Sequence, residues 1–499
     1  MISHRYEPRV SSISSLSTAG MMTIALGCLA GALVYGVTSG DPRWIIMITI
    51  VLVFACILLA LPNRKQFAWV ALILSFQFLD PAVRLFYGYS GTGGFLLTLS
   101  FLIGLCVLIV YAASGSLSKG RGVQWGGPLG LPIALLFATS AISILHGNEI
   151  ALGANQMLIQ VEMYLLYFLA LNCVRSEADI RLTMKWLFVM LAMQSIIYYA
   201  ESYLGIFYIS PLGDIVRAGD GDITRPGGTI SQGPFGFSNF ILMIMFLLMA
   251  EFMPNRPPGA RKRWTKGILI FMGVVALVLT LSRSVWVSFV LGSSALVFIS
   301  YRRRILSYRK LLYVVIAAGA VALAAAPLIM LRLESAPLES SYDERFSLMR
   351  MAVIVITENP IFGVGLGAYD IVYKQYLTPE LAEKWLWTVH NYYLLRAAET
   401  GLPGGFAWIL LLVMGLRQTL RLSKSSRLLI RTLALGIGAA IIALSHQMYW
   451  DMWTHVTAQG LFWFILGLLG AAESIEMQSR RVEFLAARNA SVSNNQVLN

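Results

Sequence analysis

Long apolar runs recur along the whole chain, and they constrain the fold more than any other feature of the sequence. The 499 residues are 57% hydrophobic and only 13% charged, whereas soluble globular domains carry about 25% charged residues. A helix of roughly 20 apolar residues is long enough to cross the hydrocarbon core of a bilayer. The composition therefore predicts a multi-pass membrane protein.

Fourteen such runs, some slightly shorter than a full span, predict an all-α polytopic membrane protein with about 12–14 transmembrane helices. They cover residues 18–38, 44–61, 67–79, 94–113, 128–145, 150–172, 182–203, 235–253, 267–281, 284–300, 311–331, 403–420, 428–446 and 457–472. Residues 267–300 can form either one long helix or two helices joined by a turn. No clear small-residue cleavage site follows the first run, so we expect a retained helix and not a signal peptide.

Basic residues concentrate in alternate loops, and this sets the expected orientation. Most of the 38 Lys and Arg residues lie in segments such as 256–266, 301–310 and 417–427, which share one side of the membrane if the helices alternate. Cytoplasmic loops carry such an excess, so both termini are predicted to be cytoplasmic. The same loops account for the formal net charge of +13. We therefore expect the lipid bilayer as a partner, and no nucleic acid.

Two long outer loops separate three groups of helices in the predicted organisation. In chain order it comprises an N-terminal tail (1–17), N-terminal transmembrane helices (18–203), a first outer loop (204–234), central transmembrane helices (235–331), a large outer loop (332–402), C-terminal transmembrane helices (403–472) and a C-terminal tail (473–499). Connections of this length usually carry function, so we expect the large loop to be catalytic.

The large outer loop is predicted to have structure of its own. Residues 341–360 predict an amphipathic helix that ends before Pro360. The apolar positions at helical spacing are Phe346, Met349, Val353 and Ile356. The glycines of IFGVGLG (361–367) follow no strand, so we interpret them as a turn and not as a phosphate-binding loop. A second short helix is expected to begin at Thr378 as N-cap.

Cations on the outer side need a local reason, because basic residues are disfavoured there. The candidate site arginines on that side are Arg217, Arg225, Arg283, Arg345, Arg350 and Arg396. Guanidinium groups bind phosphate oxygens through paired hydrogen bonds, so these residues predict an anion site. Arg283 interrupts a long apolar stretch, and an ionisable residue at such a depth indicates function. For Arg217, nearby aspartates leave an internal salt bridge as an equal alternative, and Arg345 also has acidic neighbours.

His390 is the candidate for proton transfer among the five histidines. It lies in TVHNYYLLRAAETGLPGG (388–405), directly before Asn391. Imidazole titrates near neutral pH and can accept a proton from a hydroxyl. Glu399 would lie on the opposite face of a straight helix, which favours a structural role at the GLPGG turn. No metal or cofactor is predicted, because the four cysteines lack metal-binding spacing and Asp-Gly-Asp at 220–222 is better explained by a turn.

Several of these motifs together resemble the O-antigen ligase and O-antigen polymerase superfamily of bacterial integral-membrane glycosyltransferases. The segments that carry the resemblance are RPGGTISQGPFGFSN (225–239), SRS (282–284), ER (344–345), NPIFGVGLGAYD (359–370) and HNYYLLRAAETGLPG (390–404). They fall within roughly residues 204–470, and the earlier spans share only hydrophobicity with the family. The resemblance implies a GT-C-like glycosyltransferase architecture in the bacterial inner membrane, with a long periplasmic loop and a periplasmic active site.

The resemblance also implies the reaction and the roles of the site residues. The donor would be a polyprenyl-pyrophosphate-linked glycan and the acceptor a saccharide or lipid A–core hydroxyl, in a metal-independent, inverting transfer. By position, Arg225, Arg283 and Arg345 would bind the donor pyrophosphate, and His390 would take the proton of the acceptor hydroxyl. Supporting roles would fall to Arg217, Arg350, Asn391, Arg396 and Glu399. Other polysaccharide assembly proteins are further candidate partners.

Three functional alternatives follow from the sequence. The span count, higher than is usual for the ligases, favours an O-antigen or exopolysaccharide polymerase over an O-antigen ligase. A multi-span anion or solute transporter is the second alternative. Transporters usually place ionisable groups near the membrane midplane, and the nearly charge-free spans therefore argue against this function. A structural component of an envelope polysaccharide complex would leave the outer arginines and His390 without a purpose.

Overall fold

The computed structural model of the chain describes most of the sequence from residue 61 onward. The described residues are 61–78, 98–117, 122–206, 214–218, 221–230, 233–254, 260–335, 338–377 and 388–497, together with Gly27 and Val53. The predicted spans at 18–38 and 44–61 lie almost entirely outside these residues. The short helix predicted from Thr378 also lies outside them.

Helices make up nearly all of the described structure. The α-helices are α3 (Arg64–Ser75), α5 (Leu99–Ala113), α6 (Gly130–His146), α7 (Ile150–Cys173), α8 (Glu177–Leu204), α9 (Pro234–Phe252), α10 (Ala260–Leu279), α11 (Arg283–Arg302), α12 (Tyr308–Ser335), α13 (Leu338–Glu358), α14 (Tyr369–Val372), α16 (Tyr392–Leu422), α17 (Leu428–Trp450) and α18 (Val456–Val497). Three short 3-10 helices are η1 (Phe76–Phe78), η2 (Gly127–Leu129) and η3 (Tyr373–Tyr376). The two strands are β1 (Asp214–Ala218) and β2 (Gly221–Arg225).

Nine helices within the described ranges are long and apolar enough to cross a membrane. They are α6 with the preceding η2, α7, α8, α9, α11, α12, α16, α17 and α18. Each coincides with a span predicted from the sequence, so the prediction of a helical multi-span membrane protein is confirmed. The other predicted runs in these ranges form α3, the shorter α5, and α10, which begins at Ala260 and therefore includes basic residues. Because α10 and α11 are separate, residues 267–300 do not form one long helix.

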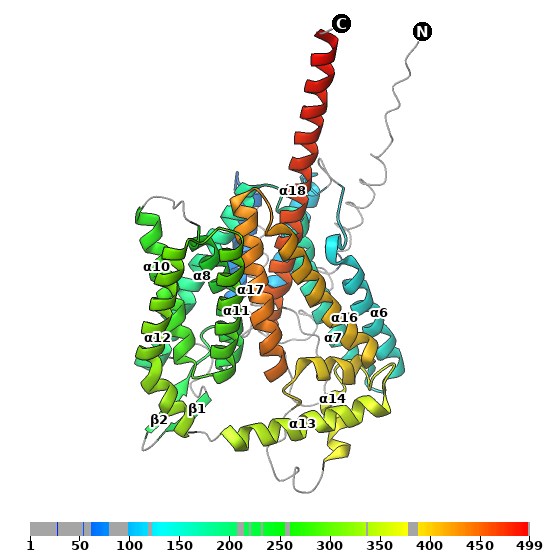
Figure 1. Ribbon diagram of the computed structural model, residues 1–499. Helices are drawn as coiled ribbons and strands as arrows, with labels where there is room; N and C mark the ends of the chain where they lie inside the picture. The colour runs from blue at the N-terminus through cyan, green and yellow to red at the C-terminus, as the bar shows by residue number, and fades with distance from the viewer. Residues whose placement is uncertain are drawn as a thin grey trace.

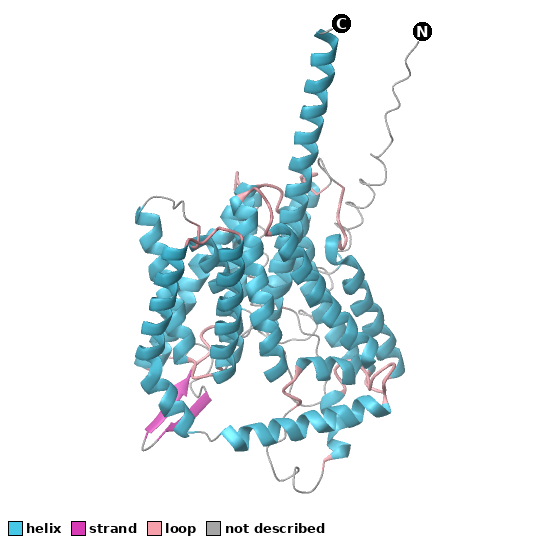
Figure 2. Ribbon diagram, in the orientation of Figure 1, coloured by secondary structure: helices cyan, strands magenta, loops and turns pink. Residues whose placement is uncertain are grey.

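The helices form a bundle, and parts of the two long outer loops lie at one of its ends. Figure 1 shows β1, β2 and α13 at this end and the free end of α18 at the other. The helix α13 crosses this end of the bundle, roughly perpendicular to α17. Figure 2 shows that the strands are confined to one small hairpin, which contacts α12. Segments that are far apart in the sequence thus meet at the end that holds α13.

The small hairpin is a departure from the predicted all-α structure. Strands β1 and β2 are antiparallel, and their register pairs Asp214 with Arg225 and Arg217 with Asp222. Both strands contain β-branched residues, which favour extended backbone. The segment is too short to leave a clear alternating pattern, so sequence periodicity predicted only a loop here.

The helix α13 confirms the amphipathic helix predicted at 341–360, and it ends before Pro360 as expected. Its buried face differs from the predicted one. Met349 and Ile356 are buried, but Phe346 and Val353 are each 46% exposed. The reason is that α13 packs on α16 and also carries apolar residues on its outward side, so its sequence has two apolar faces.

Small residues allow the closest helix crossings of the bundle. A Cβ added at Gly436 of α17 would lie 2.8 Å from the Cα of Leu247 on α9. A Cβ added at Gly467 of α18 would lie 2.3 Å from the carbonyl oxygen of Tyr167 on α7. Helices in a bilayer associate largely through such close packing, because lipid supplies little hydrophobic driving force between them.

Candidate functional site

Four arginines from four different elements interact electrostatically at the end of the bundle that holds α13. Arg225 ends β2, Arg283 begins α11 and Arg345 lies on α13. The charges of all three act on Arg332, near the end of α12. The structure therefore brings together the three arginines that the resemblance assigned to pyrophosphate binding, and it adds Arg332 to them. We call these four residues the arginine cluster.

Arg332 is anchored next to Arg283 by a backbone contact. Its Nε donates a hydrogen bond to the carbonyl oxygen of Leu281, at 3.0 Å. Leu281 lies in the turn between α10 and α11 and has a positive φ of 49°. An uncommon backbone conformation of this kind in a non-glycine residue occurs often at functional sites. The contact joins the end of α12 to the start of α11, so the two guanidinium-bearing residues belong to one local unit.

Arg225 is positioned by the loop that follows β2. The backbone N–H of Gly228 donates to Glu201 Oε2 at 2.7 Å, and Gln194 Nε2 donates to Thr229 Oγ1 at 2.6 Å. The Glu201 and Gln194 side chains, both on α8, are almost fully and fully buried, respectively. These bonds attach the loop to a transmembrane helix, which restrains the backbone only a few residues from Arg225.

His390 lies immediately before α16, and its ring orientation is defined by the backbone. Its Nδ1 is 3.0 Å from the carbonyl oxygen of Thr388. A carbonyl can only accept, so Nδ1 must carry the hydrogen, and in the neutral imidazole Nε2 is the basic nitrogen. The next residue, Asn391, caps α16 by accepting a hydrogen bond from the Leu394 N–H at 3.1 Å. The cap explains why an asparagine follows the histidine.

Charges of both signs act on His390. Burial lowers the pKa of His390 below its ordinary value, and the positive charge of Arg345 lowers this pKa further. Asp451 and the Thr388 carbonyl act in the opposite direction. Asp451 is buried at the end of α17 and accepts a hydrogen bond from Asn239 Nδ2 on α9, at 3.2 Å. Arg345 of the arginine cluster and a buried carboxylate thus act on the imidazole in opposite directions, and burial biases it toward its neutral, basic form.

The glycines before α14 support the first turns of α16 and do not form a phosphate cradle. The Val364 N–H donates to the Ala398 carbonyl at 2.9 Å, and the Leu402 N–H donates to the Pro360 carbonyl at 2.8 Å. Gly363 has a φ of 70°, and a Cβ there would lie 2.3 Å from the Glu399 backbone. The interpretation of IFGVGLG as a turn agrees with these contacts, because the loop packs directly on the α16 backbone.

Arg396 and Glu399 contact each other near the start of α16, and Arg350 lies on another face of α13 than Arg345. Arg396 is buried, with its guanidinium 5.9 Å from the Tyr392 ring and 4.0 Å from Glu399 Oε2. Arg350 is exposed on α13, and its spacing from Arg345 places it on a different face of that helix. Arg217 stands opposite Asp222 in the hairpin register.

Sequence reasoning missed Arg332, Asn239 and Asp451 as members of the site. Arg332 carried a usable signal, because it is a lone cation at the outer end of the apolar run predicted at 311–331. The pairing of Asn239 with Asp451 left no such signal, since the two residues come from distant helices. Within the described part of the chain, no group of three His, Cys, Asp or Glu side chains is arranged to hold a metal ion. Asp220 of the predicted turn lies outside it.

The fold and the site together define a multi-pass helical membrane protein with a basic, histidine-containing site at one end of its bundle. Residues 268–409 match the family model described as O-Antigen ligase, so the chain carries an O-antigen ligase family domain. This range contains Arg283, Arg332, Arg345 and His390, and it confirms the family resemblance inferred from the sequence. Arg225 lies outside the matched range and joins the site through the fold. The comparison with curated proteins gave no match to this chain.

Proposed function

We propose that the protein is a membrane glycosyltransferase that moves a glycan from a polyprenyl-pyrophosphate donor to an acceptor hydroxyl at the periplasmic face. The O-antigen ligase family domain supports an enzyme of the ligase or polymerase type. The observation that carries the proposal further is the arginine cluster beside His390. The charges of Arg225, Arg283 and Arg345 all act on Arg332, and a diphosphate offers oxygens to several guanidinium groups at once.

His390 is proposed as the general base of the transfer. The acceptor hydroxyl oxygen attacks the anomeric carbon of the donor, and its proton passes to Nε2 of His390. The bond between the anomeric carbon and the pyrophosphate oxygen breaks, and its electron pair leaves with the diphosphate. Attack on the face opposite the leaving group inverts the anomeric centre. The Thr388 carbonyl holds the tautomer that this step requires.

Arg225, Arg283, Arg332 and Arg345 are proposed to stabilise the negative charge that develops on the leaving diphosphate. Arg283 and Arg332 would act from one rigid unit, because the Leu281 carbonyl links α12 to the start of α11. No metal ion is invoked in this scheme, since fixed guanidinium groups supply the positive charge. Arg396 and Glu399 would instead maintain the first turns of α16 that follow His390.

The central experiment measures glycan transfer by the purified full chain in liposomes containing a polyprenyl-pyrophosphate-linked oligosaccharide. We expect His390→Gln to lower the rate by roughly 10²- to 10⁴-fold and Arg283→Gln by roughly 10²- to 10³-fold. Arg350→Gln is the matched control, because it removes an exposed outer arginine of α13. Wild-type rates in the His390 and Arg283 variants, with normal membrane insertion, would exclude the proposed roles.

The choice between polymerase and ligase is open to a cellular test. The predicted span count favours a polymerase of O-antigen or exopolysaccharide. Deletion of the protein would then leave short glycans of a single repeat, whereas deletion of a ligase would leave full-length chains unattached to lipid A–core. Unchanged surface glycans would contradict both and return attention to a transporter or an assembly component.

A further inference from the structure

A large pocket lies at the end of the bundle opposite to the arginine cluster. Its volume is about 980 Å³, and α8, α9, α10 and α17 line it. The lining residues come from positions 177–192 of α8, from the first turns of α10 and α17, and from the last turn of α9 together with Pro254. The pocket is lined by the N-terminal turns of α10 and α17. The C-terminal ends of the same helices, which lead to Arg283 and to Asp451, lie at the end of the bundle that holds the arginine cluster. The pocket and the proposed active site are therefore formed by opposite ends of these two helices.

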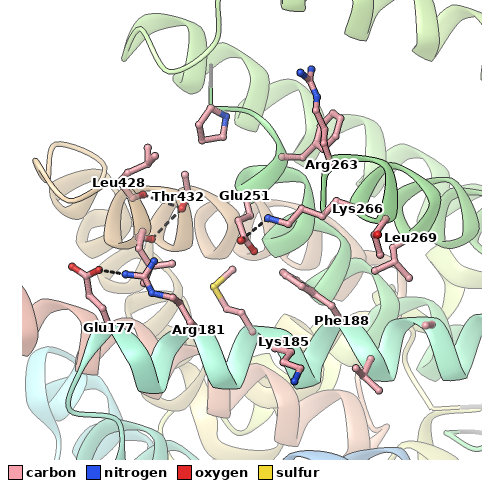
Figure 3. A pocket seen from close by; sticks show the side chains of 17 residues that line it. Glu177, Arg181, Lys185, Phe188, Glu251, Arg263, Lys266, Leu269, Leu428 and Thr432 are labelled. Atoms are coloured by element: carbon pink, nitrogen blue, oxygen red, sulfur yellow. Dashed lines mark hydrogen bonds and ion pairs between the residues drawn. The ribbon is translucent and has the colours of Figure 1, made fainter. Parts of the chain in front are cut away.

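Apolar side chains form most of the pocket wall. Phe188 of α8, Leu269 of α10 and Leu428 of α17 line the space (Figure 3), as does Met184 of α8. The neighbouring residues Ile268 and Phe271 of α10 are exposed on the outside of the bundle. The candidate spanning helix α8 also exposes apolar residues close to the lining residue Ala192, namely Met193 and Ile196. Because exposed apolar residues of a spanning helix contact lipid, the pocket borders the bilayer. Hydrocarbon chains can reach this wall directly from the membrane.

Cationic side chains outnumber carboxylates around the pocket. Four cations and two glutamates line it. Both glutamates are engaged, since Glu251 Oε1 is 2.6 Å from Lys266 Nζ and Glu177 Oε2 is 2.7 Å from Arg181 Nη2. The remaining cations are Lys185, which lies 5.6 Å from the centre of the Trp186 ring, and Arg263, which lies 5.5 Å from that of Phe252. Figure 3 shows both ion pairs: Glu251 of α9 with Lys266 of α10, and Glu177 with Arg181 within α8.

We propose that this pocket binds an anionic phospholipid of the bilayer leaflet at that end. The phosphate would interact with the excess positive charge of Lys185 and Arg263, and the acyl chains would lie along the apolar wall. Basic pockets between spanning helices bind acidic lipid headgroups for this reason, because charge and hydrocarbon are recognised together. A soluble anion would leave the apolar wall unfilled, and an uncharged lipid would leave the excess positive charge unopposed.

Native mass spectrometry of the purified full chain tests the proposal, with phosphatidylglycerol and phosphatidylcholine added to detergent micelles. We expect preferential retention of phosphatidylglycerol by the wild type. The double variant Lys185→Gln/Arg263→Gln breaks neither ion pair and should bind it roughly 30-fold more weakly, since each cation contributes about fivefold. Leu269→Trp fills the pocket without changing its charge, and it should also reduce retention.

The matched control is Arg302→Gln/Arg309→Gln, which removes two exposed cations at the same end of the bundle but outside the pocket. This control should retain phosphatidylglycerol like the wild type. Equal binding of both lipids by the wild type would overturn the proposal, as would an equal loss in the control. Undiminished retention by both pocket variants would also overturn it. Displacement of phosphatidylglycerol by an equimolar polyprenyl monophosphate would show instead that a carrier lipid occupies the pocket.

Discussion

His390 combines a defined tautomer with a lowered proton affinity. The Thr388 carbonyl accepts from Nδ1 and leaves Nε2 as the basic nitrogen. Burial and the charge of Arg345 lower the pKa of the imidazole, while Asp451 raises it. A base of this kind is neutral at neutral pH and therefore ready to accept a proton, although its lower pKa makes it a weaker base. The arrangement suits a site in which fixed cations bind a diphosphate while a neighbouring imidazole stays neutral.

The electrostatic coupling between Arg345 and His390 predicts a shift in the pH dependence of transfer. A general base works in its neutral form, so the rate falls as the pH drops through the pKa of His390. Loss of the neighbouring positive charge in Arg345→Gln raises that pKa, and the acidic limb of kcat/KM should move to higher pH. The measurement is the pH profile of kcat/KM between about pH 5 and pH 8 for the variant and the wild type. Each profile is normalised to its own maximum, because the substitution also lowers the absolute rate.

Arg350→Gln is the control for this shift, since it removes a charge from another face of α13. We expect the acidic limb of this variant to coincide with that of the wild type. A shift of equal size in both variants would mean that general surface charge, and not the Arg345 contact, sets the pKa of His390. An Arg345→Gln limb that stays in place or moves to lower pH would contradict the assigned coupling.

At the scale of secondary-structure elements, a kink divides α16, the helix that follows His390. Gly401 has φ 72° and ψ 171°, and helical residues lie on both sides of it. Backbone of this kind is essentially restricted to glycine. A Cβ at this position would lie 2.1 Å from the Ile361 carbonyl oxygen. The kink and the loop 361–367 are therefore packed against each other and must form together.

Gly401→Ala should destabilise the protein by about 2 kcal/mol or more, because it adds both backbone strain and a steric clash. The expected result is a lower Tm of the detergent-solubilised full chain, together with reduced transfer as the segment after His390 shifts. Gly319→Ala is the control, since a Cβ at Gly319 of α12 would meet no atom within 4 Å. That change should be neutral or slightly stabilising. A Gly401→Ala protein with the wild-type Tm would show that the kink does not depend on glycine.

For the whole molecule, the bundle has two chemically different ends. Figure 1 shows α13, β1 and β2 at one end and the free end of α18 at the other. The arginine cluster belongs to the end with α13, and the proposed phospholipid pocket is lined by the first turns of α10 and α17 at the opposite end. Basic loops predict that the end with the pocket faces the cytoplasm. The donor diphosphate and the acceptor would then be handled on the outer side, away from the cytoplasmic leaflet.

This orientation predicts the side from which engineered cysteines can be labelled. Arg350 on α13 and Lys424 between α16 and α17 are both exposed and lie at opposite ends. In a background without the native cysteines, Arg350→Cys should react with a membrane-impermeant maleimide added outside the inner membrane. Lys424→Cys should react only after the membrane is permeabilised. The reverse pattern would invert the topology and contradict a periplasmic site.

Local features of the sequence were enough to predict the spans and the amphipathic helix at 341–360, and to select His390 as a candidate base. Hydropathy and helical spacing act within a few residues, so each could be evaluated without knowing the fold. The buried face of α13 could not be predicted, because it carries apolar residues on two sides and only its packing on α16 distinguishes them. The hairpin of β1 and β2 was missed because its strands are short and lie in a polar loop.

The sequence by itself determined that the chain crosses the membrane repeatedly and collects arginines and a histidine in a few connecting segments, because burial and charge follow from residue type. Only the tertiary structure added Arg332 and Asp451, by placing their charges close enough to interact with Arg225, Arg283 and Arg345 and with His390, respectively. These residues come from separate elements, and helix packing sets the distances between them. The tautomer of His390 was likewise decided by folding, since it depends on where the Thr388 carbonyl points.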